Sequence, residues 1–157
     1  MTEEQKMSIS EFHKKMAVET NNGIWPILDK ANPTRQELED AMHMAHASRY
    51  HWSKVGERIN LARGDYMISR VYSAMGRAEP AIYHARRWLE ITQETGIGDW
   101  DLGFAYEALT RAYAIAGDRE RYEKYLRMAK EAIASVKSEE DRKTVQGELD
   151  KIVYKNP

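Results

Sequence analysis

Apolar residues recur at spacings of three and four along most of this chain. In residues 34–55, for example, Leu38, Ala41 and Ala45 form one stripe, and similar stripes follow in the later segments. This spacing gathers apolar side chains on one face of an α-helix. No segment shows the sustained alternation of apolar and polar residues that is typical of β-strands. The pattern therefore predicts an all-α protein.

Glycines divide the pattern into helix-sized pieces. Gly56, Gly76, Gly96 and Gly117 are separated by 20, 20 and 21 residues. Helices commonly end with a glycine just past the last turn, because glycine adopts the left-handed conformation there without strain. We therefore predict helices over residues 8–20, 34–55, 58–75, 79–95, 100–116, 119–137 and 139–153, with a short helical turn over 24–30.

Polar residues at the predicted helix starts support this division. Thr34 with Glu37 fits a capping box, in which each side chain accepts a backbone hydrogen bond of the other residue. Asp99 and Asp118 follow glycine-containing turns and are predicted N-caps. An alternative for the first of these is that the acids beside Trp100 bind a cation or a basic peptide.

Two segments of the chain echo each other. Residues 69–76 (SRVYSAMG) align with residues 110–117 (TRAYAIAG), and a second predicted helix follows each of them. A tyrosine four residues before a glycine in such a helix pair resembles the tetratricopeptide repeat. The resemblance covers about 58–96 and 100–137, with a period of 41 residues between the two tyrosines. Three further runs are residues 46–52 (HASRYHW), 60–64 (NLARG) and 104–109 (FAYEAL). Through these runs the whole chain looks like a group of small bacterial tetratricopeptide-like proteins of unassigned function.

The resemblance implies an architecture and a class of function. It implies one domain over residues 1–157, with an N-terminal extension (1–33), helix hairpins (34–137) and a capping helix (138–157). About seven helices would form a right-handed solenoid, whose concave groove binds a peptide or a partner protein. Our candidate groove residues are His46, Arg49, Tyr50, Trp52, Asn60, Arg63, Arg70, Tyr106, Glu107 and Arg111.

The arginines suggest how such a groove could hold an anionic group. Arg63 and Arg70 share one face of the segment 58–75, and guanidinium groups bind carboxylates in a bidentate way. The alternative is that the arginines pair with acids of the chain itself. Glu107 lies four residues before Arg111, which is the favourable order for an ion pair on a helix.

A second face carries imidazole groups. Glu39, His43, His46 and Tyr50 fall within an arc of roughly 60° on the segment 34–55. Such a face could hold a metal or supply a general base if a second helix added ligands. Histidines that bind a ligand without metal, or half-buried histidines bonded between packed helices, are the alternatives. We expect no metal and no cofactor, and a metal- or His-dependent enzyme remains an alternative function.

Composition narrows the range of partners. With 24 basic and 25 acidic residues the net charge is -1, which argues against nucleic-acid binding. The chain has no cysteine and therefore no disulfide, thiolate ligand or thiol nucleophile. The sequence contains no run of 18 apolar residues and therefore predicts no membrane span. The polar start at Met1–Lys6 does not resemble a secretory signal. We therefore expect a cytoplasmic protein without a membrane partner.

A different class of function is self-assembly. Trp25 and Ile27 are apolar residues near the start of the predicted array. Apolar residues exposed at the end of an array could form a symmetric homodimer. This homodimer is our alternative to the peptide-binding hypothesis.

Overall fold

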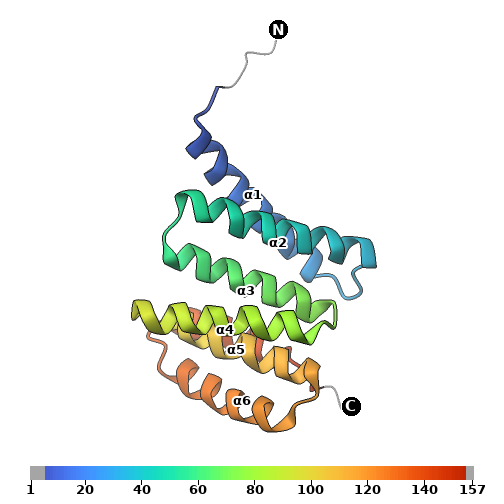
Figure 1. Cartoon of the computed structure of the whole chain (residues 1–157). Helices are drawn as coiled ribbons and strands as arrows, with labels where there is room; N and C mark the ends of the chain where they lie inside the picture. The colour runs from blue at the N-terminus through green and yellow to red at the C-terminus, as the bar shows by residue number, and fades with distance from the viewer. Residues whose placement is uncertain (1–5, 155–157) are drawn as a thin grey trace.

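The computed structural model describes residues 6–154 of the chain, and over that range it is an array of seven α-helices without a β-strand. The all-α prediction is therefore confirmed, and consecutive helices pack against one another along the array (Figure 1). The helices are α1 (Ile9–Leu28), α2 (Arg35–Val55), α3 (Arg58–Ala74), α4 (Ala78–Thr95), α5 (Trp100–Ala116), α6 (Arg119–Ala134) and α7 (Glu139–Asp150). Searched over the described residues, none of these helices has the length and hydropathy of a membrane span.

The helix starts follow the predicted capping signals with one exception. The capping box of Thr34 and Glu37 is complete, and the Asp118 side chain accepts a hydrogen bond from the backbone three residues further on. Asp99 lies at the predicted N-cap position of α5, but its side chain makes no capping hydrogen bond. Its carboxylate instead accepts a hydrogen bond from the backbone N–H of Lys137 over 2.9 Å. Asp99 thus ties the start of α5 to the segment that leads into α7.

The predicted break in the first helical segment is absent. One helix, α1, runs continuously through Gly23 and carries Pro26 in its last turn. A Cβ atom at residue 23 would lie 3.1 Å from the sulfur of Met44, so α1 and α2 approach closely at this point. The helix-breaking tendencies of glycine and proline are outweighed because α1 packs against α2 and buries Ala17 and Ile24 completely.

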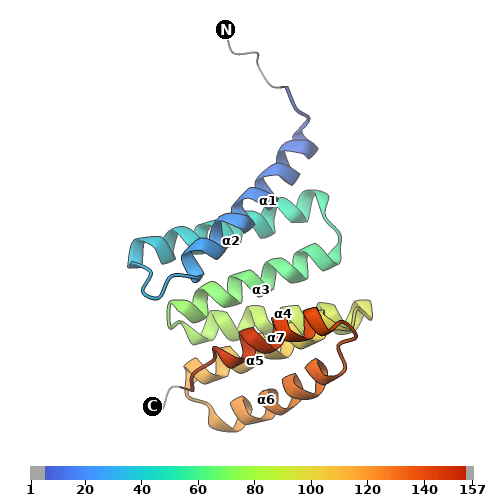
Figure 2. The same ribbon diagram turned by 180° about the vertical axis from the view of Figure 1, so that it is seen from behind.

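The helices form pairs that stack. α1 packs on α2, α3 on α4 and α5 on α6, and successive pairs contact each other. α1 also contacts α3, α3 contacts α5, and α7 lies against α5 and α6. The first helix of each pair and α7 therefore share one side of the array, which Figure 2 shows with α1 and α7 toward the viewer. We call the surface formed by α1, α3, α5 and α7 the inner face.

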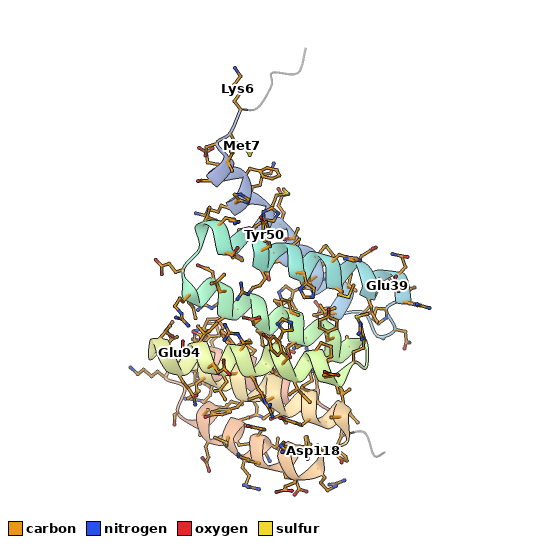
Figure 3. The ribbon with its side chains drawn as sticks, viewed as in Figure 1. Lys6, Met7, Glu39, Tyr50, Glu94 and Asp118 are labelled. Carbon is orange, nitrogen blue, oxygen red and sulfur yellow. The ribbon has the colours of Figure 1, made fainter. Side chains whose placement is uncertain are left out.

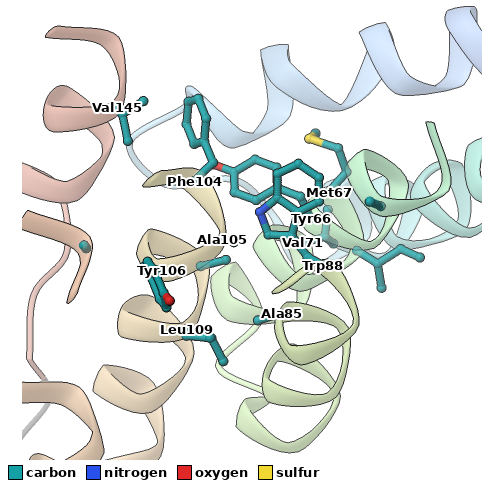
Figure 4. Close-up of a cluster of buried hydrophobic side chains, with 14 of the residues drawn as sticks. Tyr66, Met67, Val71, Ala85, Trp88, Phe104, Ala105, Tyr106, Leu109 and Val145 are labelled. Carbon is teal, nitrogen blue, oxygen red and sulfur yellow. The ribbon is translucent and has the colours of Figure 1, made fainter. Parts of the chain in front are cut away.

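The core is centred on α3 and α5. Figure 4 shows Tyr66 and Met67 of α3 beside Trp88 of α4, and Phe104 and Leu109 of α5 nearby. All five are buried within one cluster. Burying each such side chain contributes about 1.5–3 kcal/mol to folding. Because α5 contacts α3, α4, α6 and α7, it fixes the position of every element on the C-terminal half of the inner face.

Candidate functional site

The inner face contains a cavity of about 300 Å³ that is lined by residues of α1, α3, α4, α5 and α7. Five of its eleven lining residues are aromatic, and they include three of the four tryptophans of the chain. We call it the aromatic cavity. The lining residues are Asn21, Trp25, Arg63, Tyr66, Met67, Trp88, Trp100, Asp101, Phe104, Thr144 and Glu148.

The aromatic rings of the cavity hold one another in place. Tyr66 and Phe104 meet edge to face with ring centroids 5.3 Å apart, and Trp100 meets Phe104 in the same way at 5.5 Å. Trp88 lies 6.0 Å from Tyr66. Edge-to-face contacts are the favoured geometry for aromatic pairs and add to the free energy of burial. The wall of the cavity is therefore formed before any ligand arrives.

Trp88 leaves a hydrogen-bond donor unused in this wall. Its side chain is 1% exposed, and its indole N–H has no hydrogen-bond partner among the described residues. A buried donor without an acceptor costs about 1–3 kcal/mol. The residue that carries this unpaired donor lines the aromatic cavity.

Arg63 and Asp101 form the polar edge of the aromatic cavity. Arg63 donates to the two carboxylate oxygens of Asp101 from Nε at 3.3 Å and from Nη2 at 3.2 Å. The guanidinium group also lies 5.0 Å from the ring centroid of Trp100, and that of Arg70 lies 5.6 Å from the ring of Trp25. Because the chain's own cations cover these two indoles, the cavity is poorly suited to a cationic ligand.

The Arg70 side chain crosses the inner face beneath this cavity. Its Nη1 donates to Glu148 of α7 over 2.6 Å and to the hydroxyl of Tyr66 over 3.2 Å, and Glu107 lies 3.9 Å away. Burial alone would lower the pKa of Arg70, but Tyr66 and the two carboxylates outweigh it and raise that pKa. Burial would raise the pKa of Glu148, yet the hydrogen bond and charge of Arg70 lower it. Both partners therefore stay charged at neutral pH.

Glu107 lies at the base of the same network. Its side chain is fully buried, and Arg111 donates to its Oε1 from Nε at 2.9 Å and from Nη2 at 2.5 Å. The other carboxylate oxygen, Oε2, has no partner in the described part of the chain. Burial and the charge of Glu107 raise the pKa of Tyr66, which keeps that hydroxyl protonated. The arginines and the internal acids are thus brought together, as one of the two sequence-based alternatives expects.

Of the ten predicted groove residues, only Arg63 lines the aromatic cavity. Four of the other nine lie away from both the cavity and the arginine network. The Asn60 side chain accepts a hydrogen bond from the backbone N–H of residue 57 at the start of α3. Trp52 packs at the end of α2, and Tyr106 stacks on a tyrosine of α6 with centroids 6.3 Å apart. Tyr50 is 57% exposed and lies toward the opposite end of α2 from Glu39 (Figure 3).

His46 and Arg49 belong to a separate polar cluster on α2, α3 and α4. His46 Nε2 and the Tyr72 hydroxyl are 2.8 Å apart, and Asp65 contacts both His84 Nδ1 at 2.8 Å and Arg49 Nε at 3.4 Å. Partial desolvation lowers the pKa of His46, and repulsion from His84 lowers it further. This arrangement matches the alternative of histidines hydrogen-bonded between packed helices.

The predicted face of Glu39 and His43 gains no ligands from a second helix. Glu39 forms an ion pair with Arg35 on its own helix, at 3.0 Å. Over residues 6–154, no three His, Cys, Asp or Glu side chains gather closely enough to hold a metal ion. The weak metal candidates Glu39, His43 and His46 are therefore not part of a metal-ligand cluster in the described structure.

Several residues of the aromatic cavity were not predicted from the sequence. Trp88 and Phe104 are not among the groove residues that we predicted, and Trp25, which we considered for a dimer contact, lines the cavity. The signal available was the placement of three tryptophans on three separate predicted helices. In comparisons with known proteins, no family model, no curated protein and no solved structure matches the chain.

Proposed function

We propose that this chain is a peptide- or protein-binding module of tetratricopeptide-like type. The aromatic cavity of the inner face would bind an apolar anchor side chain of the partner. The observation that carries this proposal is the preformed cavity of about 300 Å³ with an aromatic wall and an unpaired Trp88 N–H. Cavities that bind ligands are typically of this size, mostly apolar and equipped with a few polar groups.

The cavity chemistry indicates the kind of anchor. An aliphatic or aromatic side chain would be desolvated against Met67 and Phe104, which is worth about 1.5–3 kcal/mol. A carbonyl oxygen of the bound segment would accept the Trp88 N–H. Arg63 offers a second donor, because its Nη1 has no partner among the described residues while Nε and Nη2 bind Asp101. An apolar anchor inside a rim of polar groups is the usual arrangement of an interaction hot spot.

Tryptophan fluorescence provides the test. Peptides selected from a random display library would be titrated against the protein, and the three cavity tryptophans should report binding. Thr144, an exposed residue of α7 at the cavity, would be changed to Trp to fill its mouth. The matched control is Gln146→Trp, on the side of α7 away from the cavity.

We expect Thr144→Trp to weaken peptide binding at least tenfold and Gln146→Trp to leave it unchanged. If a selected peptide binds both variants as tightly as the original protein, the aromatic cavity is not the binding site. If no peptide with an apolar side chain is selected, the proposed anchor chemistry is wrong.

A further inference from the structure

A second cavity lies on the inner face, on the other side of the ion pair between Arg70 and Glu148. Arg70 lines this second cavity, whereas Glu148 lines the aromatic cavity, so the pair stands between the two. The second cavity has a volume of about 180 Å³. We call it the basic cavity. Its lining residues are Leu28, Arg70, Ser73, Ala74, Arg111, Ile115, Lys151, Ile152 and Val153.

The basic cavity carries an excess of positive charge. Arg70, Arg111 and Lys151 line it, and no acid does. The carboxylates in contact with these cations are Glu148, which binds Lys151 at 2.9 Å and Arg70 at 2.6 Å, and Glu107 beneath Arg111. Three cations against two carboxylates leave one net positive charge, which a single anionic group would neutralise.

Hydrogen-bond donors of the cavity are also unused. The Ser73 hydroxyl is buried, at 6% exposure for the residue, and has no partner among the described residues. Arg70 makes all its hydrogen bonds through Nη1, which leaves Nε and Nη2 without acceptors in the described chain. Arg111 likewise uses only Nε and Nη2. Guanidinium groups with unpaired donors and a free hydroxyl favour an oxygen anion.

The rest of the lining is apolar. Leu28, Ile115, Ile152 and Val153 complete the wall together with Ala74. An apolar protein cavity of about 150 Å³ is large enough to hold benzene. A cavity of about 180 Å³ therefore suits a ligand of about six to eight non-hydrogen atoms, with one charged end and one apolar end.

We propose that the basic cavity binds a free aliphatic monocarboxylate of about four to six carbons. The carboxylate accepts hydrogen bonds from Ser73 and from the unused nitrogens of Arg70 and Arg111. The aliphatic tail packs against Ile115 and Ile152. This site is independent of the peptide site proposed above, because the two cavities have separate linings.

Isothermal titration calorimetry with hexanoate tests this proposal. Hexanamide, which has the same shape but no charge, is the control ligand. Ser73→Ala removes the hydroxyl without adding bulk, and Ser69→Ala is the matched control one turn away, outside the cavity. Circular dichroism would verify that both variants are folded, since the Ser69 hydroxyl donates to the backbone of α4.

We expect hexanoate to bind, hexanamide to bind at least tenfold more weakly, and Ser73→Ala to weaken hexanoate binding about tenfold. Ser69→Ala should leave the affinity unchanged. No heat of binding at millimolar hexanoate, equal binding of hexanamide, or an unchanged affinity in Ser73→Ala would each overturn the proposal.

Two further titrations distinguish a free carboxylate from a peptide end, and the basic cavity from the aromatic cavity. A short peptide ending in isoleucine with a free C-terminus tests whether the carboxylate belongs to a chain end. If that peptide binds in a Ser73-dependent way and hexanoate does not, the free-molecule proposal is wrong. Thr144→Trp should leave hexanoate binding intact, so failure of the peptide site and failure of the carboxylate site are distinguishable.

Discussion

The guanidinium group of Arg70 on α3 donates a 2.6 Å hydrogen bond to the carboxylate of Glu148 on α7, across 78 residues of sequence. This contact ties α7 to α3 on the inner face and lies between the two cavities found there. Arg70 is 8% exposed and also lies above the fully buried Glu107. The pair is therefore largely buried, so the loss of one partner removes the main compensation of the other charge.

We expect Arg70→Ala to lower the free energy of unfolding by up to about 3 kcal/mol, because Glu148 would keep only Lys151 and Glu107 only Arg111 as a cationic partner. Urea denaturation followed by circular dichroism would measure the change. The control is Arg35→Ala, whose side chain is 93% exposed and pairs only with Glu39; it should change stability by less than about 1 kcal/mol. Equal stability of the two variants would contradict a structural role for Arg70.

The pH dependence of stability should report Glu148. Its pKa is lowered from the ordinary 4.5, so the folded state binds fewer protons than the unfolded chain. The stability that Glu148 contributes is present above pH 4.5 and is lost as the pH falls through the lowered pKa. Glu148→Gln should be less stable at pH 7 and should lose less stability than the original protein between pH 5 and pH 3, in urea titrations at each pH. If the unfolding free energies of Glu148→Gln and the original protein changed equally between pH 5 and pH 3, Glu148 would not be the group responsible.

His46 should affect the free energy of unfolding in a higher pH range than Glu148 does. Its pKa is lowered from 6.5 by desolvation and by repulsion from His84 and His43, while Asp65 opposes the shift. The stability linked to neutral His46 is present above pH 6.5 and is lost as the pH falls toward the lowered pKa. We expect His46→Gln to reduce the slope of unfolding free energy against pH between 7.5 and 5.5. An unchanged slope would show that His46 titrates normally.

Two glycines should respond oppositely to alanine. A Cβ at Gly147 of α7 meets no atom within 4 Å, so Gly147→Ala should stabilise the protein by about 1 kcal/mol through helix propensity. A Cβ at Gly103 would lie 3.2 Å from the fully buried Val145 of α7. Gly103→Ala should therefore lose stability, because α7 must shift away from α5. Thermal unfolding would measure the stability of both variants. A gain in stability for Gly103→Ala would contradict the close packing of α5 against α7.

The sequence by itself determined the helix limits from α2 onward to within a few residues, because those limits depend on neighbouring residues. The capping box of Thr34 and Glu37 begins α2, and Gly117 ends α5 in the left-handed conformation with φ 71°. Both features involve residues within one or two turns of each other. Their chemistry is therefore readable from spacing alone.

Only the tertiary structure decided which side chains meet. α1 continues through Gly23 and Pro26 because α2 packs against it. The side chain of the N-cap residue Asp99 accepts a hydrogen bond from Lys137 rather than from its own helix. Trp25 and Glu148 come to one cavity from the two ends of the chain. Such meetings depend on the angles and order in which helices stack. A helical stripe specifies which face of a helix is buried but does not specify its neighbour.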